Sequence, residues 1–544
     1  MNVTMKELND MGLTIDKLGC ISWDKKKEIN DIVIPDTVDQ KIVYGIKDLS
    51  HSNIQSIKLP DKLRVLSEKS FFECENLREI IIPSGVTEIH ESAFERCKKL
   101  KKVKIESSMI TNLPAWVFRG CESLLTITIP KSVKIIENQA FCKCYSLKEI
   151  FFEENSSLTQ ICMRSFAECK KLVNINIPEG VEYIKDVAFY GCCSLVSIQL
   201  GKKLKQLGHG VFWDCSILES VIINSPFLIS LNNEVFKGCH NLKNVKLPNQ
   251  LEVLGDDVFF ECMSLKSIDI PDSVKEFKGC TFRKCGIEEI ILPKELTKLK
   301  PKTFSECSCL KSVFFPESIC VIENAAFYHC KELETIELPK HIKNICAGSF
   351  FNCSNLNKIT FNNNPESITA YAFDLCTNLI SVEYKISLKD AIQIGFGVYK
   401  KDDNTYSIFL KNKKSFNKQS ISDLIIPSEI DGTPVTEIAS GGFSELNSIK
   451  NVFIADNIKI IGYDAFWKCE NLLTVFCSSD LKILKNESFA DCSNLTTFRK
   501  NSCFEYLGDG CFCNTRISHT KKDLTASKIF KELSNKDIYK IFNL

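Results

Sequence analysis

The chain has 544 residues, of which 44% are hydrophobic and 25% are charged, a balance typical of a folded, soluble protein. A formal net charge of +1 excludes a general electrostatic bias toward nucleic acid, acidic substrates or anionic membranes. Because no run of eighteen apolar residues is present, the sequence predicts no membrane span.

Residues 1–28 are predicted to form a hairpin-like N-terminal cap. Two short apolar segments, Gly12–Ile15 and Cys20–Trp23, flank a turn at Lys17–Gly19. The first eleven residues lack a seven-residue apolar core, so a conventional secretory signal is not expected. We therefore expect most of the cysteines to be reduced.

From residue 29 onward the sequence repeats itself with a period of 22 to 25 residues. A Phe-x-x-Cys element occurs once in each copy, and we call its Phe the ruler phenylalanine because it marks the period. Leu446 and Thr515 replace the Cys in two copies. A period of this length indicates a solenoid, in which coils stack because one copy cannot bury its own apolar side chains. The ruler phenylalanine recurs eighteen times, at Phe71, Phe94, Phe118, Phe141, Phe166, Phe189, Phe212, Phe236, Phe259, Phe282, Phe304, Phe327, Phe350, Phe373, Phe443, Phe466, Phe489 and Phe512.

Each copy divides into three parts with different predicted structures. Leu333–Leu338 ends in the alternation of a short strand with one buried face. Pro339 ends that strand because proline lacks the amide of a central ladder, and Ile342–Ile345 forms a second extended piece. Gly348–Cys353 suits a helical turn that directs Phe and Cys inward.

The repeat pattern predicts two arrays with caps. The first array spans residues 29–385 and the second spans residues 421–517. Residues 386–420 contain a second hairpin, in which Gly397–Lys400 and Thr405–Leu410 flank a turn, and we interpret them as a second cap. The apolar pattern of residues 518–544 predicts a helical C-terminal cap, with docking of this tail on a partner as the alternative.

A search for chemistry yields no catalytic, cofactor-binding or metal site. The seven histidines occupy different phases of the repeat, and no Cys-x-x-Cys pair has a matching second pair. No phosphate-binding loop, dinucleotide fingerprint or nucleophile elbow is present. Sixteen of the 28 cysteines share one repeat position, which favours reduced packing cysteines; a disulfide ladder between coils such as those of Cys330 and Cys353 is the alternative.

The residue between the two buried positions of each strand is expected to face outward. Two apolar pairs stand out on this row, Phe453 with Phe476 and Ile291 with Phe314, and Phe151 is a fifth apolar member. We expect these five side chains to contact a protein partner, because aromatic anchors in a polar surround supply binding energy. Cross-strand packing that only stabilises the sheet is the alternative.

The unit Ala-Phe-x-x-Cys-x-x-Leu-x-x-Ile-x-Ile-Pro-x-x-Val-x-x-Ile resembles the BspA-like (Treponema pallidum-type) leucine-rich repeat. The segment Ile426–Ile438 looks like the opening of such an array. The resemblance covers about residues 29–517 and implies an α/β repeat solenoid. Its fold would be a leucine-rich-repeat-like right-handed superhelix, with a parallel sheet of short strands on the concave face and short strands or helical turns elsewhere.

For function, the resemblance implies binding proteins, and some members bind host cells or matrix proteins. We expect a non-enzymatic scaffold in the cytoplasm that binds a protein of unknown identity, is monomeric, and needs no cofactor or nucleic acid. The alternative is a surface-exposed adhesin that is exported by an unconventional route.

Overall fold

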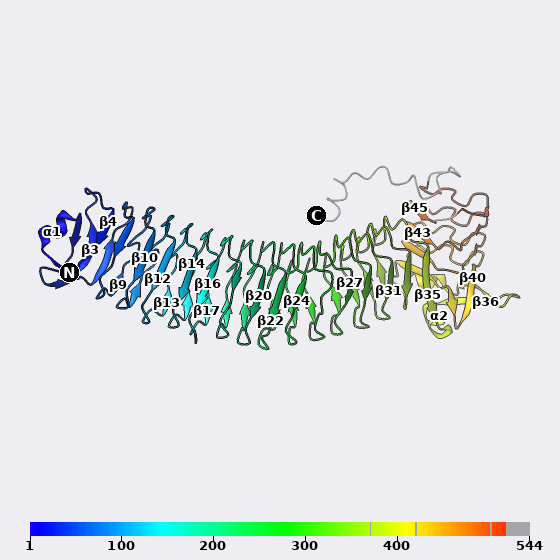
Figure 1. The fold of residues 1–544 in the computed structure, drawn as a ribbon. Coiled ribbons are helices and arrows are strands. Elements are labelled where there is room, and N and C mark those ends of the chain that lie inside the picture. The colour runs from blue at the N-terminus through cyan, green and yellow to red at the C-terminus, as the bar shows by residue number, and fades with distance from the viewer. Residues whose placement is uncertain (370, 419–420, 501–502, 518–544) are drawn as a thin grey trace. The chain divides into compact units, whose positions relative to one another are not determined.

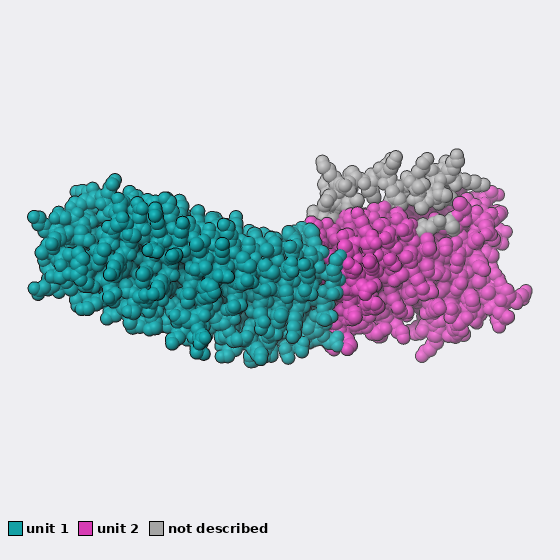
Figure 2. All heavy atoms as spheres, in the orientation of Figure 1, with its two compact units in different colours: residues 1–274 teal, residues 275–544 magenta. Residues whose placement is uncertain are grey.

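A computed structural model describes residues 1–369, 371–418, 421–500 and 503–517. Contacts divide the chain into two compact units, residues 1–274 and 275–544, which Figure 2 colours separately. Each unit consists of stacked coils that contribute short strands to parallel ladders, as Figure 1 shows. The predicted repeat solenoid is therefore confirmed, with little helix. The boundary between the units lies inside the predicted first array, and the predicted domain limits stay predictions.

In the unit of residues 1–274, the first strand of each coil occupies an equivalent position, and we call this series the first ladder. Neighbouring strands pair in parallel at a spacing of one repeat, as in Ile80 with Val103. The strands are β4 (Asp31–Val33), β8 (Ser56–Lys58), β10 (Glu79–Ile82), β12 (Lys102–Ile105), β14 (Thr126–Ile129), β16 (Glu149–Phe152), β18 (Asn174–Ile175), β20 (Ser197–Leu200), β22 (Ser220–Ile223) and β24 (Asn244–Lys246).

A second ladder follows the proline turn of each coil. Its strands have two residues each and pair in parallel, as in Leu113 with Ile136. They are β9 (Val65–Leu66), β11 (Glu88–Ile89), β13 (Asn112–Leu113), β15 (Ile135–Ile136), β17 (Gln160–Ile161), β19 (Tyr183–Ile184), β21 (Gln206–Leu207), β23 (Ser230–Leu231) and β25 (Val253–Leu254).

The unit of residues 275–544 contains two stacks of the same kind. The first ladder of one stack comprises β27 (Glu289–Ile291), β29 (Ser312–Phe314), β31 (Thr335–Leu338), β33 (Lys358–Phe361) and β35 (Ser381–Ile386), and its second ladder comprises β26 (Glu276–Phe277), β28 (Lys298–Leu299), β30 (Val321–Ile322), β32 (Asn344–Ile345) and β34 (Ser367–Ile368). The other, which we call the C-terminal stack, has β38 (Asp423–Ile426), β41 (Asn451–Ile454), β43 (Thr474–Cys477) and β45 (Thr497–Arg499) in its first ladder and β40 (Thr433–Ile438), β42 (Ile460–Ile461), β44 (Ile483–Leu484) and β46 (Tyr506–Leu507) in its second.

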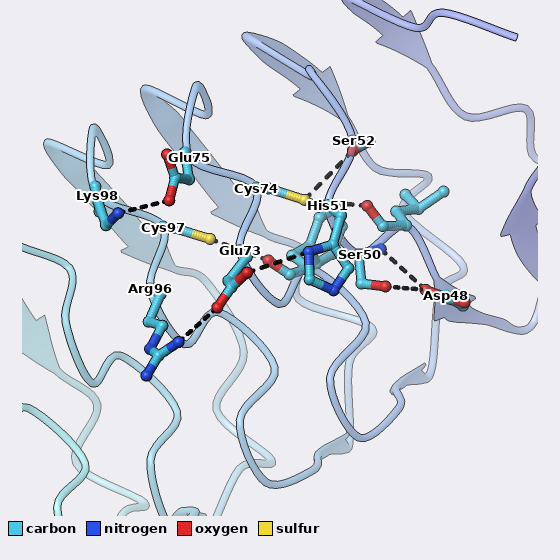
Figure 3. Close-up of polar contacts among 12 residues, drawn as sticks. Asp48, Ser50, His51, Ser52, Glu73, Cys74, Glu75, Arg96, Cys97 and Lys98 are labelled. Carbon is cyan, nitrogen blue, oxygen red and sulfur yellow. Dashed lines mark hydrogen bonds and ion pairs between the residues drawn. The ribbon is translucent and has the colours of Figure 1, made fainter. Parts of the chain in front are cut away.

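The core is a column of phenylalanine rings, one from each coil. Consecutive rings from Phe71 to Phe259 are stacked with centroids 5.1–5.7 Å apart. This lies within the range of favourable offset stacking. The repeat cysteine fixes neighbouring coils to each other, because the Cys97 thiol donates to the Phe71 carbonyl at 3.1 Å. Figure 3 shows Cys97 and the Cys74 thiol beside it.

The Phe-x-x-Cys segment is a series of turns rather than the expected helical turn. Two residues of each coil have left-handed backbone, as at Lys69 (φ 57°) and Glu73 (φ 55°), which a right-handed helix does not allow. The resulting backbone directs the N–H groups of Lys69, Phe71 and Glu73 toward carbonyl groups of the next coil, at 2.8–3.0 Å. Bonds between coils thus replace bonds within a helix.

The N-terminal cap contains the predicted hairpin. A short strand and a helix capped by Thr4 precede it, and a bulged parallel pairing joins β3 to β7. The first strand pairs in parallel with β5. The elements are β1 (Asn2–Val3), α1 (Met5–Asp10), β2 (Leu13–Ile15), β3 (Cys20–Trp23), β5 (Thr37–Val38), β6 (Lys41–Ile42) and β7 (Gly45–Asp48).

The same element order recurs where the C-terminal stack begins. The end of β35 pairs in parallel with β39, a helix capped by Ser387 and the predicted hairpin follow, and a bulged parallel pairing joins β37 to β40. The added elements are α2 (Leu388–Ile394), β36 (Phe396–Lys400), β37 (Tyr406–Leu410), α3 (Lys413–Asn417) and β39 (Glu429–Ile430). The helical cap expected at residues 518–544 lies outside the described residues.

Candidate functional site

The outward row of the first ladder is the surface on which the sequence places its candidate contacts. Three of the five predicted side chains are exposed there: Phe151 at 50%, Ile291 at 73% and Phe314 at 54%. Ile291 and Phe314 are direct partners in the pairing of β27 with β29, so they form one apolar patch. Their role in binding stays a prediction.

The predicted exposure of Phe453 and Phe476 is wrong. Their side chains are only 0% and 6% exposed, although they occupy the outward row of the C-terminal stack. The two rings stack on each other at 4.7 Å, and Phe453 also contacts Phe361 and Phe373 at 5.8 and 5.7 Å. The outward face of the C-terminal stack therefore covers the last coil of the preceding stack, within the same unit.

A pair of buried polar side chains binds the edge strand of that last coil. Asp423 accepts a hydrogen bond from the Ile368 backbone N–H at 2.7 Å, and Asn451 donates to the Ile368 carbonyl at 3.1 Å. Asn451 also donates to Asp423 at 2.6 Å, which fixes both side chains. Burial raises the pKa of Asp423, and these hydrogen bonds oppose that rise in part.

A second carboxylate, Asp456, binds β35, the last first-ladder strand of the same stack. It accepts hydrogen bonds from the Val382 N–H at 2.9 Å and from the Ser381 hydroxyl, while its own N–H donates to the Val382 carbonyl at 2.7 Å. Burial raises the pKa of Asp456 as well. Asp456 thus supplies donors and acceptors that a further coil would otherwise provide.

An ion pair closes the same junction. Arg499 donates to the Phe373 carbonyl at 3.1 Å and to the Asp374 carboxylate at 3.0 Å. The Phe373 carbonyl is the kind of group that the cysteine of a following coil bonds elsewhere in the stack, as Cys376 does with Phe350. The sequence pattern does not reveal this junction, because the contacting residues are up to 126 positions apart.

Polar side chains near the N-terminal end form contacts between neighbouring coils. Glu73 lies between His51 at 3.2 Å and Arg96 at 2.6 Å, and Lys98 pairs with Glu75 at 2.6 Å, as Figure 3 shows. These contacts join neighbouring coils at the surface. Within the described ranges, no three His, Cys, Asp or Glu side chains converge in a way that could hold a metal ion.

The model of the BspA-type leucine-rich repeat region matches residues 46–173, 159–288, 279–401 and 411–535, which is most of the sequence. The chain belongs to the BspA-type leucine-rich repeat family. The matched ranges contain the phenylalanine column of both arrays, and they leave out residues 402–410 of the second hairpin. A comparison with curated proteins gives no match.

Solved structures similar to this BspA-type chain are leucine-rich repeat proteins. One from Bacteroides ovatus is 22% identical, with 85% of this chain and 92% of that chain covered and a TM-score of 0.44. The pneumococcal vaccine antigen PcpA is 16% identical over 89% and 94%, with a TM-score of 0.32. The Treponema pallidum leucine-rich repeat protein is 23% identical over 46% and 86%, with a TM-score of 0.23.

No helix in the described part of this BspA-type chain has the length and apolar character needed to cross a membrane. Other exposed apolar side chains lie off the outward row, as Phe227 at 58% does, or lie on it without an apolar partner in register, as Ile81 does opposite Lys104. The Ile291–Phe314 patch is therefore the candidate site that combines large apolar side chains, exposure and direct strand pairing.

Proposed function

We propose that the chain is a non-enzymatic scaffold that binds another protein on the outward row of its first ladder, with Ile291 and Phe314 as anchors. The observation that supports this proposal is the junction inside the C-terminal unit. There, aromatic residues of the same row are buried: Phe453 contacts Phe373 of the preceding stack, and Phe476 stacks on Phe453.

The energetic argument rests on the apolar surface of Ile291 and Phe314 that is still exposed to solvent. Burying a large apolar side chain contributes about 1.5–3 kcal/mol relative to exposure. Ile291 and Phe314 keep most of their surface in solvent, whereas the strand residues on either side of them, such as Ile290 and Val313, are already buried. A partner that covers the pair gains this energy without any rearrangement of the coil. Phe151, which is 50% exposed, is a separate candidate contact within the unit of residues 1–274.

The test is the double variant Ile291→Ser/Phe314→Ser in the full chain. We expect partner capture from the native cells, quantified by mass spectrometry, to fall at least tenfold, because two anchors are worth about 3 kcal/mol together. Phe227→Ser, which removes an equally exposed ring off the row, is the matched control. A lower melting temperature with unchanged capture would instead support cross-strand packing as the role of the pair.

We further propose a cytoplasmic, monomeric protein, with a cell-surface adhesin as the alternative. Surface biotinylation of intact cells separates the two locations, since only the adhesin would be labelled. Light scattering of the purified chain gives the oligomeric state.

A further inference from the structure

The N-terminal end of the first ladder carries an open, acidic face that nothing else in this unit covers. We call it the N-terminal face. It surrounds a hollow of about 530 Å³. Its main residues are Asp31, Val33, Ser56, Lys58, Asp61 and Ile81.

This face is the counterpart of the one that is buried in the C-terminal stack. Both stacks begin with the same order of strand, helix, hairpin and bulged parallel pairing. The first-ladder strand of each start has the same form, Asp31-Ile-Val-Ile-Pro35 in one and Asp423-Leu-Ile-Ile-Pro427 in the other. The leading aspartate is therefore at the same place in both copies.

The partner of each aspartate is also equivalent. Asp31 is paired in register with Ser56, which donates to it at 2.6 Å. Asp423 is paired in register with Asn451, which also donates at 2.6 Å. In the C-terminal copy the pair goes on to bind the N–H and carbonyl of Ile368.

The second carboxylate follows the next strand by the same distance. Asp61 is three residues after Lys58, and Asp456 is three residues after Phe453. Asp456 binds the Val382 N–H and carbonyl at 2.9 and 2.7 Å. Asp61 is exposed, and no group among the described residues donates to its carboxylate.

The outward row is exposed at the N-terminal face and buried at the start of the C-terminal stack. Val33 and Ile81 of the N-terminal face are 46% and 52% exposed. Their counterparts in the C-terminal stack, Ile425 and Phe476, are 0% and 6% exposed. The difference between the copies is thus the presence of a bound coil edge.

The charge of the N-terminal face limits what can bind there. Four carboxylates line the hollow, with Glu79 and Glu106 beside Asp31 and Asp61, against one lysine, Lys58. Glu106 is paired with a neighbouring lysine, and the other three carboxylates have no ion pair among the described residues. A cationic or hydrogen-bond-donating segment fits, whereas a polyanion does not.

We propose that the N-terminal face binds an open β-edge of a partner protein, an extended segment with unpaired backbone N–H groups and with Lys or Arg side chains. Asp31 and Asp61 accept backbone N–H groups, as Asp423 and Asp456 do at the internal junction. Apolar side chains of the segment lie against Val33 and Ile81. Side-chain carboxylates thus bind the partner's β-edge, in place of the main-chain ladder that β-augmentation uses. The proposal does not depend on the Ile291–Phe314 patch.

The test is selection of a displayed library of random peptides on the full-length chain. The probe is then a selected peptide, and its dissociation constant is measured on the wild type and on Asp31→Ala, Asp61→Ala and the double variant. We expect each single variant to bind at least about tenfold more weakly, since a hydrogen bond to a charged acceptor is worth about 1.5–3 kcal/mol. Both side chains are exposed, so melting temperatures should not change.

A backbone probe separates strand recognition from simple charge attraction. N-methylation of one residue in the selected peptide removes an N–H without changing the charge. We expect one of the two Asp→Ala substitutions to have no further effect on the affinity for the methylated peptide. The exposed Glu154→Ala variant and Ile291→Ser/Phe314→Ser should bind as the wild type does.

Selected peptides that bind the double variant unchanged, or that tolerate N-methylation at every position, would overturn the proposal. Binding only of nucleic acid or acidic polysaccharide would do the same. Self-association of the chain that Asp31→Ala abolishes would support it and would identify a second copy as the source of the edge.

Discussion

Each coil places one phenylalanine and one cysteine at its centre, and these two residues carry most of the contact between neighbouring coils. Phe327 is fully buried and stacks on Phe304 and Phe350 at 5.3 and 5.0 Å. The Cys330 thiol donates to the Phe304 carbonyl at 3.1 Å. The ring supplies apolar burial and the thiol supplies a directed bond, so the two side chains are not interchangeable.

Truncation of one ring should have a large cost. We expect Phe327→Ala to lower the free energy of unfolding by about 3–5 kcal/mol, because it leaves a cavity between two rings that cannot both move inward. Urea denaturation followed by circular dichroism measures the change. Phe314→Ala, which removes an exposed ring of the same size, is the control. Equal losses for the two variants would contradict a ring column as the core.

The buried position of the repeat cysteines also predicts their reactivity. Burial raises the pKa of the Cys74 thiol to about 11, so little thiolate forms at neutral pH. Cys193, Cys503 and Cys513 are exposed. We expect a thiol reagent followed by mass spectrometry to label these three in the folded protein and to leave the sixteen repeat cysteines unmodified. Rapid labelling of Cys74 would contradict the packing role.

At the scale of elements, the sequence predicts the strands and turns well and the junction poorly. Pro339 marks where a strand ends, and each ruler phenylalanine marks where a ring enters the core. Both features can be predicted because they involve contacts only with the coils one repeat away. The direction of Phe453 was also predictable, because strand residues alternate between two faces. The residues that cover Phe453 were not predictable, because its contacts with Phe361 and Phe373 join distant parts of the chain.

The predicted second cap is the signal in the sequence that points to the junction. The restart at Asp423 copies the start at Asp31, which indicates a new stack with its own cap rather than a continuation of the old one. In the described residues, β38 pairs with β41 and not with β35. A new stack can lie across the end of the preceding one, whereas a continuation cannot.

The junction should respond to pH. Burial raises the pKa of Asp423 and of Asp456 in the folded protein, so folding favours their protonated forms. Their contribution to stability is therefore fully present below the ordinary value of 3.8 and is lost as the pH rises through the raised values. Thermal melting of Asp423→Asn should show a weaker pH dependence over this window than the wild type. Asp402→Asn, at an exposed position, should leave the pH dependence of melting unchanged. A steeper pH dependence in Asp423→Asn would contradict the role of Asp423 at the junction.

At the scale of the whole molecule, the stacks have mainly nearest-neighbour contacts. Stability is then a sum of coil terms and interface terms, and local damage stays local. We expect Phe327→Ala to increase amide hydrogen exchange in the coils of Phe304, Phe327 and Phe350 first. Exchange in the coils around Phe94 should stay as in the wild type. A uniform increase over all coils would show a single cooperative core instead.

The left-handed residues of the Phe-x-x-Cys segment give each stack a direction. In the coil of Lys69, Phe71 and Glu73, the N–H groups point toward the next coil, and the carbonyl groups that receive them come from residues synthesised later. A finished coil therefore offers donors to the part of the chain that is still emerging from the ribosome. Each finished coil is thus a folded template to which the next coil can be added as it is made.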